Sequence, residues 1–159
     1  MKNRIIELGR YKEIITKALF KDDNVRSLIV NNDGLTKKEQ LDIFKKHVKS
    51  HLFIDDTITD ESTYIFYDIR CPKFGTTIKD VVVIMYVICH RETLDDISID
   101  GFYGNRVDIL SEMVTDAIVE NEYVSNQFGI GELDLSGIDI YNSKRFYGRI
   151  LTFSVPNFR

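Results

Sequence analysis

Apolar residues in the first third of the chain recur every three or four positions, the spacing of one face of an α-helix. The stripe holds four apolar residues and one polar interruption: Ile5, Leu8, Lys12, Ile15 and Leu19. It predicts a long N-terminal helix. Asp22 or Asp23 is placed to cap a second, shorter helix, because a carboxylate can accept hydrogen bonds from the free N–H groups at a helix start.

Residues 31–60 contain a further helical signal. Residues 31–34 read Asn-Asn-Asp-Gly, which favours a turn because Asn and Gly tolerate positive φ. Thr36 and Glu39 then match a capping box, in which each side chain satisfies a free backbone N–H at a helix start. We expect residues 31–60 to form an inserted helical excursion, which either packs on the domain or fastens onto a neighbouring molecule.

The pattern changes to that of β-strands in the middle of the chain. Residues 63–69 are rich in β-formers, and we expect Cys71 and Pro72 to end this strand because proline cannot donate to a sheet. Residues 79–90 form the most apolar segment, which is typical of a central strand covered on both faces. The two strands are expected to pair as a long antiparallel hairpin.

A helix and a second hairpin complete the pattern. Asn105 is expected to cap the helix, with Asp108 in its first turn, where a negative charge is favourable. In the strands that follow, the apolar alternation changes phase at Gly137, which indicates a β-bulge or bend, and residues 146–155 form the return strand. Strands grouped in pairs predict an α+β fold: N-terminal helices, then a mainly antiparallel sheet of two β-hairpins separated by and packed on a helix. No composition break divides residues 1–159, so a single domain is expected.

Composition and charge exclude several classes of protein. The chain has 159 residues, 43% of them hydrophobic, and a formal net charge of -4. A mildly acidic chain is a poor general binder of phosphate backbones, whose affinity comes from many Lys and Arg contacts. We find no signal-peptide pattern, and the longest apolar run, residues 81–89, is shorter than the ~20 residues that cross a bilayer, so no membrane partner is expected. Cys71 and Cys89 are read as reduced thiols of an intracellular product.

The histidines and cysteines do not form a recognisable metal site. His47 and His51 are four residues apart, which places both on one helix face, but a third ligand is missing. Cys89 and His90 are neighbours on a predicted strand, so their side chains point to opposite faces. The glycine-rich motifs that hold phosphates are also missing. No metal and no cofactor are therefore expected.

Strand-borne carboxylates leave one catalytic alternative open. Metal-dependent nucleases use acidic residues on strands with a nearby lysine, and Asp68 and Asp80 both lie at predicted strand ends. The usual acid-x-Lys element is missing, because residues 81–89 carry no charge. We expect the protein not to be an enzyme, and a small metal-dependent nuclease using Asp68 and Asp80 is the alternative from another class.

Aromatic and basic residues are interleaved where the last strand begins. The set consists of Lys144, Arg145, Phe146, Tyr147 and Arg149. Tyr and Arg dominate the hot spots of protein–protein interfaces, so these five residues are interface candidates. A half-buried strand with an aromatic core side also explains the pattern. A stacking platform for nucleic acid is less favoured, because the chain is acidic overall.

Three segments carry a resemblance to a known family. They are residues 22–29 after the first helix, residues 104–110 at the start of the later helix, and residues 145–155 in the final strand. Together with the order of elements, they resemble the tail terminator and neck (head-to-tail joining) proteins of long-tailed bacteriophages. The helix expected within residues 31–60 departs from that pattern.

The resemblance implies a structural virion protein, the tail terminator first, with another connector or tail-completion protein as the alternative. Such proteins form rings, six-fold for terminators, that cap the tail tube and join it to the head. The implied partners are other copies of the chain, the tail tube protein and the head-side connector protein, while DNA passes through without specific binding. The implied location is the virion neck, after assembly in the host cytoplasm. Asp95, Asp96 and Asp100 lie in an acidic loop that we expect to form a rim of the DNA channel.

Overall fold

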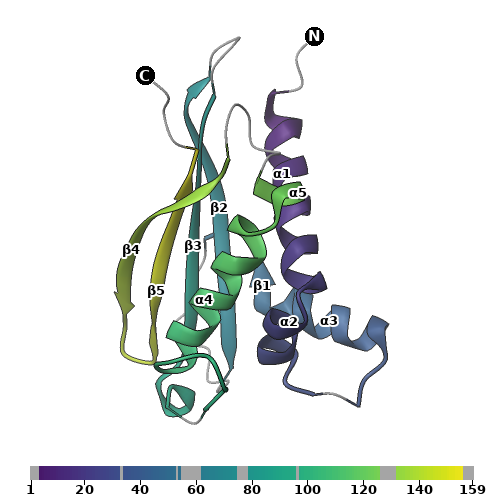
Figure 1. Ribbon diagram of the computed structural model, residues 1–159, viewed down its shortest axis with the longest axis vertical. Helices are drawn as coiled ribbons and strands as arrows, with labels where there is room; N and C mark the ends of the chain where they lie inside the picture. Colours follow the sequence, from purple (N-terminus) through teal and green to yellow (C-terminus); the bar gives the residue numbers. More distant parts are fainter. Residues whose placement is uncertain are drawn as a thin grey trace.

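The computed structural model describes residues 4–32, 34–52, 54, 62–74, 79–95, 97–125 and 132–155 (Figure 1). It confirms the α+β class. The elements in chain order are α1 (Arg4–Lys21), α2 (Asp23–Val30), α3 (Lys37–His47), β1 (Val48–Lys49), β2 (Thr63–Phe74), β3 (Lys79–His90), the 3₁₀ turn η1 (Arg91–Thr93), α4 (Arg106–Val119), α5 (Glu122–Ser125), β4 (Asp134–Asn142) and β5 (Phe146–Ser154).

The five strands form one sheet in the order β1-β2-β3-β5-β4. Both predicted hairpins are confirmed: β2 pairs antiparallel with β3, and β4 pairs antiparallel with β5. The hairpins join where β3 pairs antiparallel with β5. The short strand β1 adds in parallel to β2, which makes the sheet mixed. A two-residue strand has too little sequence to show a period, so it was not predicted.

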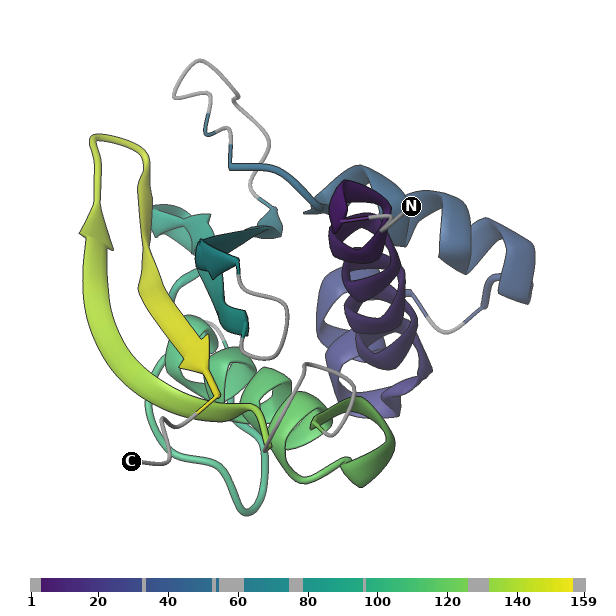
Figure 2. The ribbon, with the colours of Figure 1, turned by 90° about the horizontal axis from the view of Figure 1, so that it is seen from above.

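Helices cover one face of the sheet, and the main core lies between them. In Figure 2, α1, α2 and α4 lie on the same side of the curved sheet. Alternate residues of β3 point into this core, and Val83, Met85 and Val87 are fully buried. On the other face, Ile88 belongs to a smaller cluster, whereas Tyr86 is half-buried. The expectation that β3 is covered on both faces is therefore only partly met. A continuous apolar run does not show whether helices or only a few side chains cover each face of a strand.

Two further expectations from the pattern need correction. The apolar stripe of α1 is buried only from Tyr11 onward, and Ile5 is 82% exposed. The strand β2 does not end at Pro72, because the chain continues in the sheet to Phe74 with a register shift between Arg70 and Lys73. Proline is tolerated in a sheet where such an irregularity interrupts the ladder.

Side-chain caps begin three of the helices as predicted. Asp22 accepts from the backbone N–H of Val25 to start α2, and Asn105 accepts from that of Asp108 to start α4. Thr36 and Glu39 form the capping box of α3.

The helix α3 packs on the domain. Phe44 is fully buried, and its ring meets Phe20 of α1 edge to face at 5.2 Å. The residues that follow, Val48 and Lys49, enter the sheet as β1. The helix therefore adds to the core while its lysine-bearing side faces solvent.

Candidate assembly surface

The strand β4 is the edge of the sheet, and no described strand pairs with its outer side. Ile138 and Ile140, which share one face of this strand, are 62% and 55% exposed. The predicted bulge is present as a register shift between Leu135 and Gly137, and it sets which face the two isoleucines occupy. An unpaired strand with exposed β-branched residues is a template for pairing with another chain.

A groove of about 350 Å³ separates the edge hairpin from α4. We call it the acidic groove, and its lining residues are Asp108, Ser111, Glu112, Thr115, Leu135, Ile138, Arg149 and Leu151. The strands supply its apolar wall, and α4 supplies its polar wall. The Ser111 hydroxyl is buried and has no hydrogen-bond partner among the described residues. A buried hydroxyl without a partner costs free energy, so this wall is suited to receive a polar group.

Arg149 does not point to solvent from the last strand. Its Nε donates to Oδ1 of Asp108 at 2.9 Å, which ties β5 to α4 at the acidic groove. This hydrogen bond raises the pKa of the Arg149 guanidinium above its ordinary value, so the guanidinium stays charged. Arg149 is thus the cation of an ion pair within the chain.

The other predicted interface residues are divided between different places. Phe146 is 1% exposed and packs against Tyr64 and His90 on the face away from the helices. Tyr147 lies half-buried against the main core. Lys144 is exposed and Arg145 half-buried, both at the turn between β4 and β5. The five residues do not share one surface, because neighbours on a strand point to opposite faces.

The predicted acidic rim lies at the end of the molecule where the β4–β5 turn is also found. Asp95 and Asp100 are exposed, whereas Asp96 lies outside the described residues. Arg91 connects the two regions: its backbone N–H donates to the carbonyl of Arg145 at 2.9 Å, and its Nε donates to that of Ser143 at 3.0 Å. A role of these aspartates in lining a channel stays a prediction.

The two residues of the nuclease alternative lie at separate positions along the β2–β3 ladder. Asp68 is paired with Lys12, whose Nζ lies 3.0 Å from its Oδ1. In the β2–β3 ladder Asp68 lies opposite Ile84, so Asp80 is four residues further along β3, or roughly 14 Å. A single ion needs its oxygen ligands within about 2.5 Å, so this separation along the backbone does not favour a shared ion. In the described part of the chain, no group of three or more His, Cys, Asp or Glu side chains could hold a metal ion.

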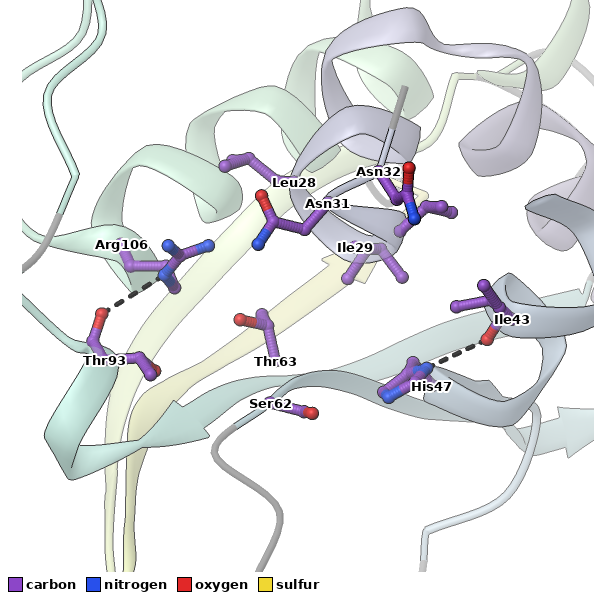
Figure 3. Close-up of a pocket in the computed structure, with 11 residues that line it drawn as sticks. Leu28, Ile29, Asn31, Asn32, Ile43, His47, Ser62, Thr63, Thr93 and Arg106 are labelled. Atoms are coloured by element: carbon purple, nitrogen blue, oxygen red, sulfur yellow. Dashed lines mark hydrogen bonds between the residues drawn. The ribbon is translucent and has the colours of Figure 1, made fainter. Parts of the chain in front are cut away.

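A second hollow, of about 330 Å³, lies between the ends of α2 and α3 and the start of α4 (Figure 3). Arg106, Asn31 and Thr63 point toward one another across it. Arg106 donates from Nε to the carbonyl of Thr93 at 3.2 Å, and Nδ1 of His47 lies 2.9 Å from the carbonyl of Ile43. These contacts hold loop and helix ends in place, so we assign this polar pocket a structural role.

Sequence reasoning missed the acidic groove, although one signal for it was present. Asp108, Glu112, Asp116 and Glu120 recur every fourth residue, which places them along one side of α4. Ile138 and Ile140 follow the alternating apolar pattern of a hairpin strand, and that pattern does not show whether the strand is covered. Only the end position of β4 in the sheet leaves them uncovered.

Comparison with known proteins places the chain in a family. No helix in the described part of the chain is both long enough and apolar enough to cross a bilayer. No curated protein matches this chain. The model of the YomW family matches residues 13–155, which is most of the chain. This chain therefore belongs to the YomW family, a phage-associated family.

Proposed function

We propose that this protein is a structural component of a bacteriophage neck, and specifically the tail terminator. In this role, copies of the chain form a ring that caps the tail tube and joins it to the head-side connector. Membership of a phage-associated family supports the phage setting, and the resemblance in element order supports the neck. The observation that carries the proposal is the exposed edge strand β4 with Ile138 and Ile140.

An uncovered edge strand of this kind needs a partner. Native proteins usually protect long edge strands with charges, prolines or bulges, whereas β4 keeps two large apolar side chains exposed beyond its bulge. Pairing with another chain would satisfy the free backbone groups and bury the isoleucines together. When such a contact joins two different surfaces of identical subunits, repetition gives a closed ring or an open filament.

The role we propose is structural rather than catalytic. Asp68, one of the two carboxylates of the nuclease alternative, pairs with Lys12, and Arg149, an interface candidate, pairs with Asp108. We therefore expect the partners to be proteins, namely other copies, the tail tube protein and the head-side connector. DNA is expected to pass through the ring without specific binding, and the finished protein to reside in the virion neck.

The test is a phage that carries a stop codon in this gene, grown with and without a complementing copy. We expect filled heads and unattached tails of irregular length without the protein, and normal particles with it. Antibody-labelled gold on complemented particles should mark the junction of head and tail. Tails of normal length that fail to join heads would favour another connector or completion protein. Infectious particles that form normally and lack the protein would overturn the proposal.

A further inference from the structure

We propose that copies of this chain associate head to tail, with the acidic groove of one copy receiving the lysine-rich side of α3 from the next. This inference rests on the proposed function in taking a second copy as the occupant of the groove. The two surfaces lie at opposite ends of the subunit and are complementary in charge.

The first surface is negatively charged beside exposed apolar groups. Glu112 and Asp116 are exposed on α4, one helical turn apart. Arg149, the basic residue among those lining the groove, is already paired with Asp108. Ile138 lies on the opposite wall, so the groove joins an acidic side to an apolar side. A complementary segment must therefore carry both cations and methylene groups, as lysine side chains do.

The groove also contains a polar group that needs a partner. Ser111 is 8% exposed, and its hydroxyl has no hydrogen-bond partner among the described residues. Buried hydroxyls are nearly always hydrogen-bonded in native proteins. A donor or acceptor arriving with a docked segment would satisfy it, and this observation is independent of the acidic side chains.

The second surface lies at the other end of the subunit. Figures 1 and 2 show α3 on the side of the molecule away from β4. We call this surface the lysine edge, and its basic residues are Lys37, Lys38, Lys45, Lys46 and Lys49. Against these stand Glu39, which is used in the capping box, and Asp42. Lys45 and Lys46 are exposed and make no ion pair with a described residue.

These positions favour a head-to-tail contact over a symmetric pair. A two-fold contact would either set acidic groove against acidic groove, or require both groove–lysine edge contacts to form between the same two copies, which patches at opposite ends of the subunit disfavour. Like charges brought together suppress such a pairing, whereas opposite patches steer the correct partner into register. Because the two patches lie at opposite ends of the subunit, each copy can bind one neighbour on either side. This is the requirement for a ring of identical subunits.

Charge reversal on each surface tests the contact. One variant carries Lys45→Glu with Lys46→Glu, and the other carries Glu112→Lys with Asp116→Lys. All four side chains are exposed, so we expect both variants to fold, as checked by circular dichroism and thermal melting. Sedimentation velocity should show that each variant alone associates at least about tenfold more weakly than the natural protein. A control matched to the lysine variant, Lys17→Glu with Lys21→Glu on α1, changes the net charge by the same amount as that variant and should associate normally.

Mixing the two variants gives the decisive result. Each keeps one natural patch, and the reversed patches are complementary to each other. An equal mixture should therefore recover association, with the two variants alternating and only even-numbered rings formed. Raising salt from about 0.1 M to about 1 M, which shortens the Debye length from ~10 Å to ~3 Å, should weaken assembly of the natural protein.

Several outcomes would overturn this contact. They are a natural protein that stays monomeric at every concentration, single variants that assemble normally, or a mixture that does not recover. Failure of the contact can be told from failure of the proposed function by the phage experiment. If the protein is present at the neck but its charge-reversed variants still assemble, only the proposed contact is wrong. If the protein assembles as described but is missing from particles, the contact is supported and the neck role is wrong.

Discussion

Arg149 of β5 donates from Nε to Oδ1 of Asp108 of α4 at 2.9 Å, although the two residues are 41 positions apart in the chain. Asp108 also lies in the first turn of α4, where its backbone N–H is held by the Asn105 cap. Asp108 therefore helps to start α4 and also fastens this helix to the second hairpin. The pair therefore joins the two walls of the acidic groove.

We expect a double-mutant cycle of Arg149→Leu and Asp108→Asn to give a coupling free energy of about 0.5–1 kcal/mol, because the pair is only partly buried. Urea unfolding of the four proteins measures it. The pair between Arg26 and Asp23 is a control, since the Asp23 side chain is 88% exposed, and its coupling should be smaller. Equal coupling at the two sites would show that burial of the Arg149 pair contributes nothing.

Gly148 allows β5 to lie close against β3. A Cβ at this position would lie 2.2 Å from the carbonyl oxygen of Val87 and 2.9 Å from the Cα of Ile88. Since backbone atoms cannot move aside cheaply, we expect Gly148→Ala to lower the free energy of unfolding by about 2–3 kcal/mol.

The control for that substitution is Gly9→Ala in α1. A Cβ there meets no atom within 4 Å, and alanine is favoured over glycine in a helix by about 0.5–1 kcal/mol. Gly9→Ala should therefore raise the free energy of unfolding, measured by the same urea titration. If Gly148→Ala leaves the free energy of unfolding unchanged or raises it, the close approach at Gly148 is not a constraint.

Tyr67 connects β2 to α1 and should make stability depend on pH. Its hydroxyl donates to the carbonyl of Lys12 at 2.7 Å and also contacts Thr16, and burial raises its pKa from 10.0 to about 12. The unfolded chain would lose this proton near pH 10, whereas the folded protein keeps it. The contribution is complete below pH 10 and is lost as pH rises to about 12, with a total of roughly 3 kcal/mol.

Unfolding free energies measured from about pH 8 to about pH 12, a range centred on the ordinary tyrosine pKa of about 10, check this expectation. Tyr67→Phe should cost about 1 kcal/mol at neutral pH and reduce the decline above pH 10. Tyr103→Phe should change neither, because Tyr103 is 91% exposed. Burial also raises the pKa of Tyr11 to about 12, so part of the decline in the free energy of unfolding should remain in Tyr67→Phe. An unchanged decline in Tyr67→Phe would contradict the assignment.

The capping box orders the helix that carries the lysine edge. Thr36 accepts from the backbone N–H of Glu39, and the Glu39 carboxylate accepts from that of Thr36. We expect Thr36→Ala to lower the free energy of unfolding by about 1 kcal/mol, and Thr36→Ser to preserve it, because serine keeps the hydroxyl. Hydrogen exchange of the first α3 amides should rise in Thr36→Ala alone.

Local chemistry was enough to predict most of the elements. Asn105, Thr36 and Gly137 act on backbone groups within a few residues of themselves, so their roles can be read directly from their neighbours in the chain. The pairing of the hairpins also follows, because successive strands with short connections usually lie side by side. The predicted end of β2 was wrong, because a proline at an irregularity in the ladder does not stop a strand.

The sequence by itself determined the α+β class, the caps, the bulge and both hairpins, because each depends on nearby residues or on the period of the apolar pattern. Only the tertiary structure decided which surfaces are open. The sheet order puts β4 at an end, so Ile138 and Ile140 are exposed although their pattern is that of a core strand. It also pairs Arg149 with Asp108 and separates the lysine edge from the acidic groove. These relationships join residues far apart in the chain, and no local pattern carries information about them.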